Sequence, residues 1–387
     1  MNFLPTEEQD QVRTTVRTFL ENEMVPLDRE HGDREMTPEL ARQLLKKLLP
    51  FGYLGRERTD DPLIEAILFE ELARVFPSLL GMQYIAGRVA ASIDASAHPA
   101  LHERLAGPLL DCDRIGCFGI SEPNVGSDPR SIECKAVRRG DRYVVSGTKC
   151  WISNGHIADV AIVTLRVREE DGSERHGDLV IDREESPFES RDIETIGLKA
   201  WPLSELFFDG VEVPAINLLS RNGSFTAPRV DADGRRREAP DFRDARCMCA
   251  LASCGIAQRA LEMALAYAKQ RKQFGKEIGR FQLVQALLAD MAMDLEAARL
   301  LTYRARQLLA VRPGEGEVSM AKAFATEMVV RVTSKALECM GAMGLTREAY
   351  IERLYRDARM WIVPDGTAQI QRLVIGRELT GFSAVHG

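Results

Sequence analysis

Hydrophobic residues recur every three to four positions along the first part of the chain. This spacing puts them on one face of a helix, and it predicts helices over Glu7–Asn22, Thr37–Leu48 and Pro62–Phe76. Thr6 precedes the first helix and Gln9 follows three residues later, so a capping box is expected to begin that helix. Residues 1–114 are therefore predicted to form an N-terminal helical domain.

The hydrophobic period changes to two between Ile115 and Pro214, where β-branched residues are frequent and Gly-Asp and Asp-Gly pairs mark turns. Strands are predicted over Arg142–Ser146, Val160–Val167, Asp178–Ile181 and Leu206–Val213. We interpret residues 115–220 as a central antiparallel β domain of the barrel or sandwich type. Residues 221–240 are polar, contain glycine and proline, and are predicted to form a linker or surface loop.

The helical period returns after residue 240. Helices are predicted over about 241–271, 281–311, 316–344 and 366–380. Long helices with an apolar stripe and short connections are typical of an antiparallel four-helix bundle, which is assigned to residues 241–387. The hydrophobic pattern thus predicts an α+β multidomain protein, with helical, β and helical regions in that order.

Composition narrows the possible functions. Of the 387 residues, 45% are hydrophobic, which is ample for a core, yet no run approaches the roughly 18 apolar residues of a membrane span. The first residues resemble no secretory signal, so a cytoplasmic location is the expectation. The net charge of −7 argues against general nucleic-acid binding, because no basic excess is available to neutralise phosphates.

The eight cysteines are scattered and include no Cys-x-x-Cys pair. Cys247 and Cys249 are separated by one residue, but a zinc site would need a better-spaced second pair of ligands. We therefore expect buried, reduced thiols and no metal.

Two short motifs in the β region offer groups that could bind a polar or aromatic ligand. Phe118–Asp128 (FGISEPNVGSD) leads from a strand into a turn with free backbone N–H groups and hydroxyls. Cys150–Gly155 (CWISNG) carries an indole that could cover a flat aromatic cofactor. Taken singly, the first motif is more typical of an ordinary strand-to-loop turn, and the second is more typical of a core tryptophan at the end of a strand.

Together the two motifs closely resemble the flavin-binding half-site of acyl-CoA dehydrogenases. Further blocks resemble that family in the same order, namely Arg271–Gln282, Leu337–Gly344, Arg353–Arg359 and Asp365–Arg372. The resemblance covers nearly the whole chain. It implies the family fold, with an N-terminal helical domain, a central β domain and a C-terminal four-helix bundle.

The resemblance also implies one FAD per subunit. Its binding residues would be Phe118, Gly119, Ile120, Ser121, Trp151, Ile152, Ser153, Arg271, Phe274, Gln282, Glu338, Gly341, Gly344, Thr367 and Gln369. Among these, Arg271, Phe274 and Gln282 would hold the pyrophosphate and adenosine of FAD in a neighbouring subunit, a task that suits the planar guanidinium fork. Contact with the substrate is implied for Ser127, Arg246 and Gly366.

The catalytic base implied by the resemblance is Asp365, directly before Gly366 and Thr367. It would remove the α-proton of an acyl thioester while a β-hydride passes to flavin N5, and its backbone N–H would bind the thioester oxygen. Many relatives carry glutamate here. Aspartate is shorter by about 1.5 Å, and a misplacement of about 1 Å can cost about 10²-fold in rate. Ala245 occupies the alternative base position of some relatives, and Asp244 is a reserve candidate.

The predicted activity is FAD-dependent α,β-desaturation of an acyl-CoA, as in fatty acid metabolism. The resemblance implies a homotetramer that passes electrons to an electron-transfer flavoprotein. Three alternatives stay open: a dehydrogenase of acyl-carrier-protein thioesters, a flavin oxidase or monooxygenase of the same fold, and a non-catalytic subunit. Arg235–Arg237 is interpreted as a solvated loop that could also meet a CoA phosphate or an acidic carrier protein.

Overall fold

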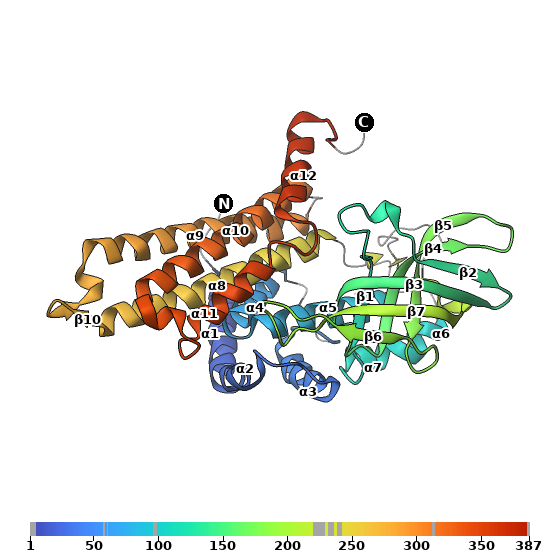
Figure 1. Cartoon of the computed structure of the whole chain (residues 1–387), viewed down its shortest axis with the longest axis horizontal. Coiled ribbons are helices and arrows are strands. Elements are labelled where there is room, and N and C mark those ends of the chain that lie inside the picture. The colour runs from blue at the N-terminus through green and yellow to red at the C-terminus, as the bar shows by residue number, and fades with distance from the viewer. Residues whose placement is uncertain are drawn as a thin grey trace.

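The computed structural model describes residues 5–56, 59, 61–95, 99–219, 229–230, 236–237, 242–311 and 314–384. Helices come first, a sheet follows, and a long helical bundle ends the chain (Figure 1). In that view the sheet lies on the right, the bundle extends to the left, and the first helices lie below the bundle. The α+β multidomain architecture expected from the hydrophobic pattern is therefore confirmed.

The N-terminal region is helical as predicted. It contains α1 (Glu7–Phe19), α2 (Val25–His31), α3 (Pro38–Leu48), α4 (Pro62–Val75), α5 (Pro77–Asp94), α6 (Pro99–Leu101) and α7 (Gly107–Leu110). The capping box before α1 is confirmed: the backbone N–H of Gln9 donates to Thr6 Oγ1 at 3.2 Å, and the backbone N–H of Thr6 donates to Gln9 Oε1 at 3.0 Å.

The sequence also explains the break between α4 and α5. Pro77 disfavours a helical conformation at the residue before it, and Phe76 has φ −139° and ψ 78°. The helix predicted over Pro62–Phe76 consequently ends at Val75. At its start, the carboxylate of Asp61 accepts hydrogen bonds from the backbone N–H groups of Leu63 and Ile64.

One sheet forms the central domain. Its strands are β1 (Gly116–Gly119), β2 (Lys135–Arg139), β3 (Arg142–Ser153), β4 (Val160–Arg168), β5 (Glu174–Asp182), β6 (Glu189–Asp192) and β7 (Leu203–Pro214). They follow the order β1-β4-β2-β3-β7-β6, and β5 also pairs with β4. β5 takes one edge of β4, while β1 and β2 share the other.

The expectation of a purely antiparallel sheet is corrected, because β1 and β2 both run parallel to β4. β3 turns back antiparallel to β2, and β4 then lies beside β2 rather than beside β3. β4 therefore follows β3 along the chain without pairing with it, and it runs in the direction of β2. The two-residue period shows which segments are strands, but it carries no information on their direction.

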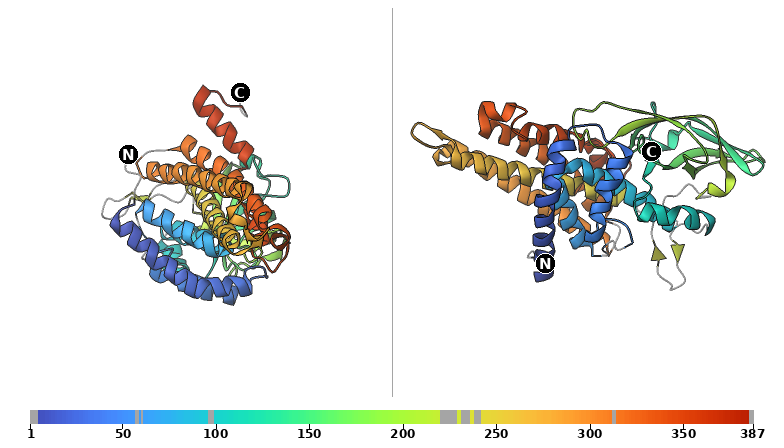
Figure 2. Two further views of the ribbon diagram at one scale, coloured as in Figure 1. Left: turned by 90° about the vertical axis from the view of Figure 1, so that its left-hand side faces the viewer. Right: turned by 90° about the horizontal axis from the view of Figure 1, so that it is seen from below.

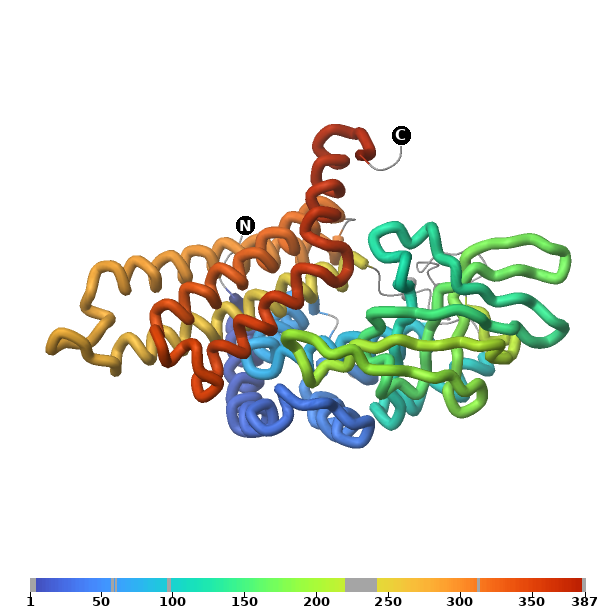
Figure 3. Tube along the Cα trace, viewed as in Figure 1, coloured from blue at the N-terminus to red at the C-terminus, as the bar shows by residue number. Residues whose placement is uncertain are grey.

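The C-terminal region contains α8 (Phe242–Gln270), α9 (Gln282–Leu309), α10 (Glu315–Met340), α11 (Ile351–Met360) and α12 (Ala368–Thr380). A small hairpin, β10 (Lys272–Gln273) and β11 (Lys276–Glu277), joins α8 to α9 at the end of the bundle that points away from the sheet (Figures 1 and 3). α11, which the hydrophobic period did not single out, packs with α12 on α10. The two turned views show α8, α9 and α10 side by side along their length (Figure 2).

The structure describes part of the predicted linker. Arg229–Val230 (β8) and Arg236–Arg237 (β9) pair as short antiparallel strands. The rest of the range 221–240, including Arg235, lies outside the described residues. Within the described parts of the chain, no helix is long and apolar enough to cross a membrane.

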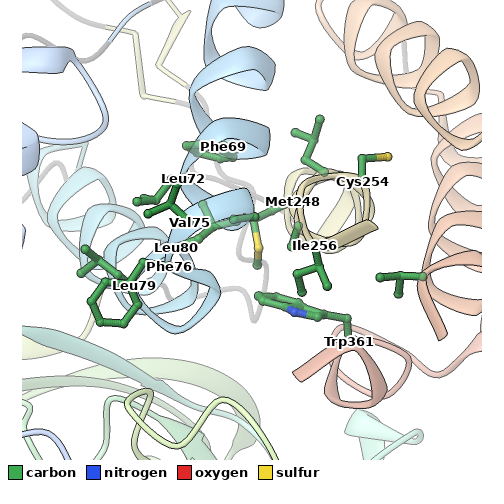
Figure 4. Close-up of a cluster of buried hydrophobic side chains, with 14 of the residues drawn as sticks. Phe69, Leu72, Val75, Phe76, Leu79, Leu80, Met248, Cys254, Ile256 and Trp361 are labelled. Atoms are coloured by element: carbon green, nitrogen blue, oxygen red, sulfur yellow. The ribbon is translucent and has the colours of Figure 1, made fainter. Parts of the chain in front are cut away.

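The hydrophobic core of the helical regions is centred on α4, α5 and α8 (Figure 4). It includes Phe69, Leu72, Val75, Phe76, Leu79, Leu80, Met248, Cys254, Ile256 and Trp361. Gly255 lets α4 and α8 approach closely, because a Cβ there would lie 2.3 Å from the carbonyl oxygen of Glu70. The bundle is thus built directly onto the N-terminal helices.

Two tryptophans join the sheet to the bundle. The ring of Trp361, directly after α11, stacks on Trp201, two residues before β7, at a centroid distance of 5.5 Å. Trp201 Nε1 donates to Asn154 Oδ1 at 3.1 Å, and Asn154 Nδ2 donates to the Met82 carbonyl at 3.1 Å. A Cβ on Gly81 would lie 2.5 Å from the Trp201 ring, so glycine makes room for it. The end of α11 is therefore fixed against the end of β3.

A buried charge cluster reinforces the same junction. Arg353 on α11 forms an ion pair with Asp28 at 2.6 Å and lies 3.5 Å from the carboxylate of Asp357. Asp357, which is 1% exposed, accepts a hydrogen bond from the Leu198 backbone N–H at 2.6 Å. Burial raises the pKa of Asp357 to about 6, although Arg353 acts in the opposite direction.

Asp357→Asn should change how stability depends on pH. The pKa of Asp357 is higher in the folded than in the unfolded protein. The contribution of Asp357 to the free energy of unfolding is therefore complete below about pH 4, and it is lost as the pH rises to about 6. The asparagine still accepts the Leu198 N–H but cannot titrate. The free energy of unfolding of the wild type, relative to the variant, should therefore fall by up to about 3 kcal/mol between these pH values. Urea denaturation across the range measures it, and parallel curves would contradict the assignment.

A second buried ion pair holds the chain where β1 ends. Lys149 on β3, which is 0% exposed, donates to Glu122 Oε1 at 2.8 Å and to the Ile120 carbonyl at 2.9 Å. Glu122 also accepts the backbone N–H groups of Glu133 and Cys134. These hydrogen bonds lower the pKa of Glu122 against the effect of burial. The pair therefore fixes the segment after β1 onto β3.

Glu122→Gln should be strongly destabilising, because it leaves the buried Lys149 ammonium without its counter-charge. A loss of about 3–5 kcal/mol in the free energy of unfolding is expected. The matched control is Glu174→Gln, which breaks the exposed Arg168–Glu174 pair and should cost less than about 1 kcal/mol. Chemical denaturation of the three proteins gives the comparison. Equal small effects would show that the buried pair contributes no more than a surface pair.

Candidate active site

The proposed base, Asp365, lies in the turn between α11 and α12. Its φ is +55°, a left-handed conformation that costs a non-glycine residue on the order of 1–3 kcal/mol. Gly366 follows with φ +90°, and Thr367 Oγ1 caps α12 by accepting from the Ile370 N–H at 3.4 Å. Such a conformation persists only where neighbouring groups hold it.

Donors from three helices hold this turn. The carbonyl oxygen of Asp365 accepts from Arg246 Nε and from Gln371 Nε2, both at 3.3 Å. Gln371 also donates to the Gly366 carbonyl at 2.8 Å. From α10, Lys322 Nζ donates to the carbonyl oxygens of Pro364 and Gly366. The residues on both sides of Asp365 are therefore bound to the bundle.

The carboxylate of Asp365 is partly buried and faces α8. Cys249 Sγ, which is fully buried, donates to Asp365 Oδ2 at 3.6 Å. Burial raises the pKa of Cys249 well above its usual value, so this group is a neutral thiol and acts as a donor. Ala245, at the alternative base position, is fully buried. The reserve candidate Asp244 forms an ion pair with Arg306 at 2.8 Å.

The two flavin motifs meet at the end of β3. The Ser121 carbonyl accepts from the Cys150 N–H at 2.9 Å, and Lys149 holds Ile120 as described above. The register between β3 and β7 shifts between Lys149 and Ile152, and Trp151 there adopts φ +63°. A bulge of this kind re-aims a side chain. The indole is consequently 55% exposed.

The remaining residues of these motifs differ in exposure. Gly119 and Ile152 are buried, Phe118, Ile120, Ser121 and Ser153 are half-buried, and Ser127 is exposed. A depression of about 440 Å³ opens beside Trp151, lined also by Cys150, Pro123 and Arg191. An exposed indole beside a fixed, partly open stretch of backbone fits the flat ring system of a flavin.

The predicted pyrophosphate and adenosine residues lie elsewhere. Arg271, Phe274 and Gln282 are exposed around the β10–β11 hairpin, at the end of the bundle opposite the sheet (Figure 1). Phe274 is 93% exposed. Of the residues expected near the end of α10, Glu338 and Gly341 are exposed and Gly344 is buried. Within one chain, Arg246 therefore lies beside Asp365–Thr367. Phe118–Ser121 likewise lies beside Trp151–Ser153. Arg271 lies near neither group.

The sequence reasoning missed Lys322, Cys249 and the Lys149–Glu122 pair. Lys322 could have been noticed, because it interrupts the apolar stripe of Val318, Ala325, Val329 and Val332 on α10. A charged residue on a buried helix face requires a partner. The partners of Lys322 are distant in sequence and could not be identified from it.

The prediction of buried, unbridged cysteines is confirmed for all eight. Within the described ranges, no group of three or more His, Cys, Asp or Glu side chains could hold a metal ion.

Comparison with known proteins identifies the family. The family models for the N-terminal, middle and C-terminal domains of acyl-CoA dehydrogenase match residues 6–113, 117–211 and 233–380. A probable acyl-CoA dehydrogenase of Bacillus subtilis is 34% identical over 98% of this chain and 100% of its own. A cyclohex-1-ene-1-carbonyl-CoA dehydrogenase of Geobacter metallireducens is 35% identical, covering 97% and 98%.

A solved structure gives the same result. The structure of butyryl-CoA dehydrogenase from Megasphaera elsdenii has a TM-score of 0.84 and 28% identity, covering 98% of this chain and 100% of that one. The helical and sheet regions described above therefore have the arrangement found in that enzyme. The chain belongs to the acyl-CoA dehydrogenase family, the FAD-dependent oxidoreductases that act on CH–CH groups.

Proposed function

We propose that this protein converts an acyl-CoA thioester into its α,β-unsaturated product, with Asp365 as the base that removes the α-proton. The observation that carries this proposal is the left-handed turn at Asp365, held by donors from α8, α10 and α12. Such a turn can offer a carboxylate and a backbone N–H from one residue. Deprotonation beside a thioester carbonyl requires both a base and an oxyanion donor.

When bound, FAD supplies the acceptor for the hydride that leaves the β-carbon. We assign contacts with its ring system to Phe118–Ser121 and Trp151–Ser153. Lys149 and the Cys150 N–H fix the first of these segments, so it cannot shift when a ring packs on it. Thr367 and Gln369 begin α12, whose free N–H groups suit a phosphate.

The second end of the cofactor site would come from another subunit. Arg271, Phe274 and Gln282 are assigned to the pyrophosphate and adenosine of a neighbour's FAD, as are Glu338, Gly341 and Gly344. The exposure of Phe274 and of Leu283, which is 83% exposed, supports a homotetramer in which this end of the bundle is covered. An electron-transfer flavoprotein is the proposed electron acceptor.

The acyl group proposed is a cyclic or otherwise compact one. Aspartate is shorter than the glutamate of many relatives by about 1.5 Å, so the α-carbon must lie nearer to the turn. A relative with 35% identity is named for cyclohex-1-ene-1-carbonyl-CoA, a cyclic thioester. Ser127 and Gly366 are assigned to the thioester end of the substrate. Arg246 is assigned to the CoA portion, and it also holds the Asp365 carbonyl.

Anaerobic bleaching of the flavin tests the substrate, using straight, branched and cyclic acyl-CoAs with one carrier-protein thioester. The proposal expects the fastest bleaching with a cyclic acyl-CoA. Bleaching by the carrier-protein thioester alone would favour a biosynthetic enzyme, and rapid reoxidation by O₂ would favour an oxidase. Failure of every thioester would favour a non-catalytic subunit.

Asp365→Asn should abolish exchange of the α-proton with solvent deuterium, because the amide cannot accept a proton. The expected loss is about 10²–10⁴-fold or more, with folding and FAD content retained. Asp365→Glu should impair the native substrate while favouring straight chains, since its carboxylate reaches further. Mass spectrometry of recovered thioester measures exchange, and rapid mixing measures flavin reduction.

The matched control is Asp244→Asn, which should retain exchange because Asp244 is engaged by Arg306. The opposite result, with exchange lost in this variant and kept in Asp365→Asn, would move the role of base to Asp244.

Arg271→Ala should weaken binding of FAD far more than binding of FMN, because FMN has no pyrophosphate. This loss of FAD affinity is expected because Arg271 is proposed to contact the FAD of a neighbouring subunit. The active species must then be an oligomer. Equilibrium dialysis with both flavins and light scattering of the active protein test this. A fully active, flavin-loaded monomer of 43.2 kDa would rule out the assignment.

A further inference from the structure

Lys322 is a buried cation bound to the turn that carries Asp365. It lies in the middle of α10, is 0% exposed, and donates to the carbonyl oxygens of Pro364 and Gly366. No carboxylate lies within ion-pair distance of it among the described residues. Burying an ammonium costs several kcal/mol. An apolar residue would fill this stripe of α10 at a lower cost in free energy, so a buried charge at this position needs a physical reason.

The geometry of the peptide between Pro364 and Asp365 supplies one. The carbonyl of Pro364 and the N–H of Asp365 belong to the same planar unit, and in a trans peptide they point in opposite directions. No cis peptide occurs in the described chain. Lys322 holds the carbonyl toward α10, so the Asp365 N–H points away from that helix. Among the described residues this N–H has no hydrogen-bond acceptor.

The charge of Lys322 also affects the strength of that donor. A cation bound to a carbonyl oxygen polarises the amide, and a polarised N–H donates more strongly, as in any chain of hydrogen bonds. Donors that are already oriented in a site of low dielectric stabilise developing negative charge without reorganising. Cys249 and Arg246 hold the rest of Asp365 at the same time, through its carboxylate and its own carbonyl.

We propose that Lys322 is a positioning residue of the reaction, which fixes and polarises the Pro364–Asp365 peptide so that the Asp365 N–H binds the thioester oxygen while the Asp365 carboxylate takes the α-proton. The inference rests on the proposed function. Under this proposal the base and the oxyanion donor lie in one turn, and the buried charge of Lys322 orients that turn. Because Lys322 acts through the peptide, it should affect the transition state more than substrate binding.

Lys322→Gln and Lys322→Met test the proposal on the FAD-loaded protein with the best acyl-CoA of the panel. The methionine variant should lose about 10²–10³-fold in kcat, comparable to loss of one oxyanion donor, with KM changed less than about threefold. The glutamine variant keeps a donor without the charge and should fall between it and the wild type. The control is Lys335→Met on the same helix, which removes only a surface pair with Asp290 and should behave as wild type.

A second measurement separates polarisation from general loss of structure. A 3-oxoacyl-CoA has no hydride to give at its β-carbon, so its chemistry stops at removal of the α-proton. The absorbance of its enolate against pH reports how strongly the site acidifies that proton. Both variants at Lys322 should acidify the bound thioester less than the wild type, while Lys335→Met should not differ.

The outcomes are distinguishable. If Lys322→Gln keeps kcat within about threefold and acidifies the analogue normally, the proposal is wrong, whether or not the methionine variant folds. A raised KM with unchanged kcat would equally overturn it, because Lys322 would then only shape binding. If Asp365→Asn abolishes exchange in parallel tests, such results reject only the role of Lys322. Retained exchange in Asp365→Asn would reject the proposed function itself.

Discussion

The stacking of Trp361 on Trp201 is the contact on which the arrangement of the site depends. It joins the end of α11 to the sheet, and Asn154 links the Trp201 indole to α5. Two large aromatic rings that pack face to face bury much apolar area and restrict each other's orientation. The turn that carries Asp365 and the bulge that carries Trp151 begin only a few residues from this contact. This contact therefore fixes the orientation of the sheet relative to the helical bundle, although the two have separate hydrophobic cores.

Three buried cations hold backbone segments in place. Lys149 fixes the segment after β1, Lys322 fixes the turn before α12, and Arg353 fixes α11 against the N-terminal helices. Each cation donates to oxygen atoms that lie outside its own helix or strand. A buried charge contributes little net stability, but it tolerates few alternative arrangements of its partners. Lys149 and Lys322 hold the two segments that the proposed site uses, where orientation matters more than overall stability.

The elongated bundle has a consequence for assembly. Its far end carries an exposed hairpin with Phe274 and a proposed phosphate-binding arginine, while the opposite end meets the sheet. The cofactor site proposed above uses residues from both ends, so one chain would not complete it. The proposed function therefore depends on a symmetric partner, and the exposed apolar residues of α9 provide a surface that such a partner could cover.

The sequence by itself determined the order of the regions, because hydrophobic periods of 3.6 and 2 are local properties of each segment. It also determined the cap at Thr6 and the break before Pro77. The roles assigned to the site residues stay predictions, since they rest on resemblance. Only the tertiary structure decided the parallel course of β1 and β2 beside β4, because strand direction depends on which edge is free. It alone placed Lys322 and Cys249 around Asp365. A buried charge or thiol acquires its role from partners far away along the chain, and no local pattern records them.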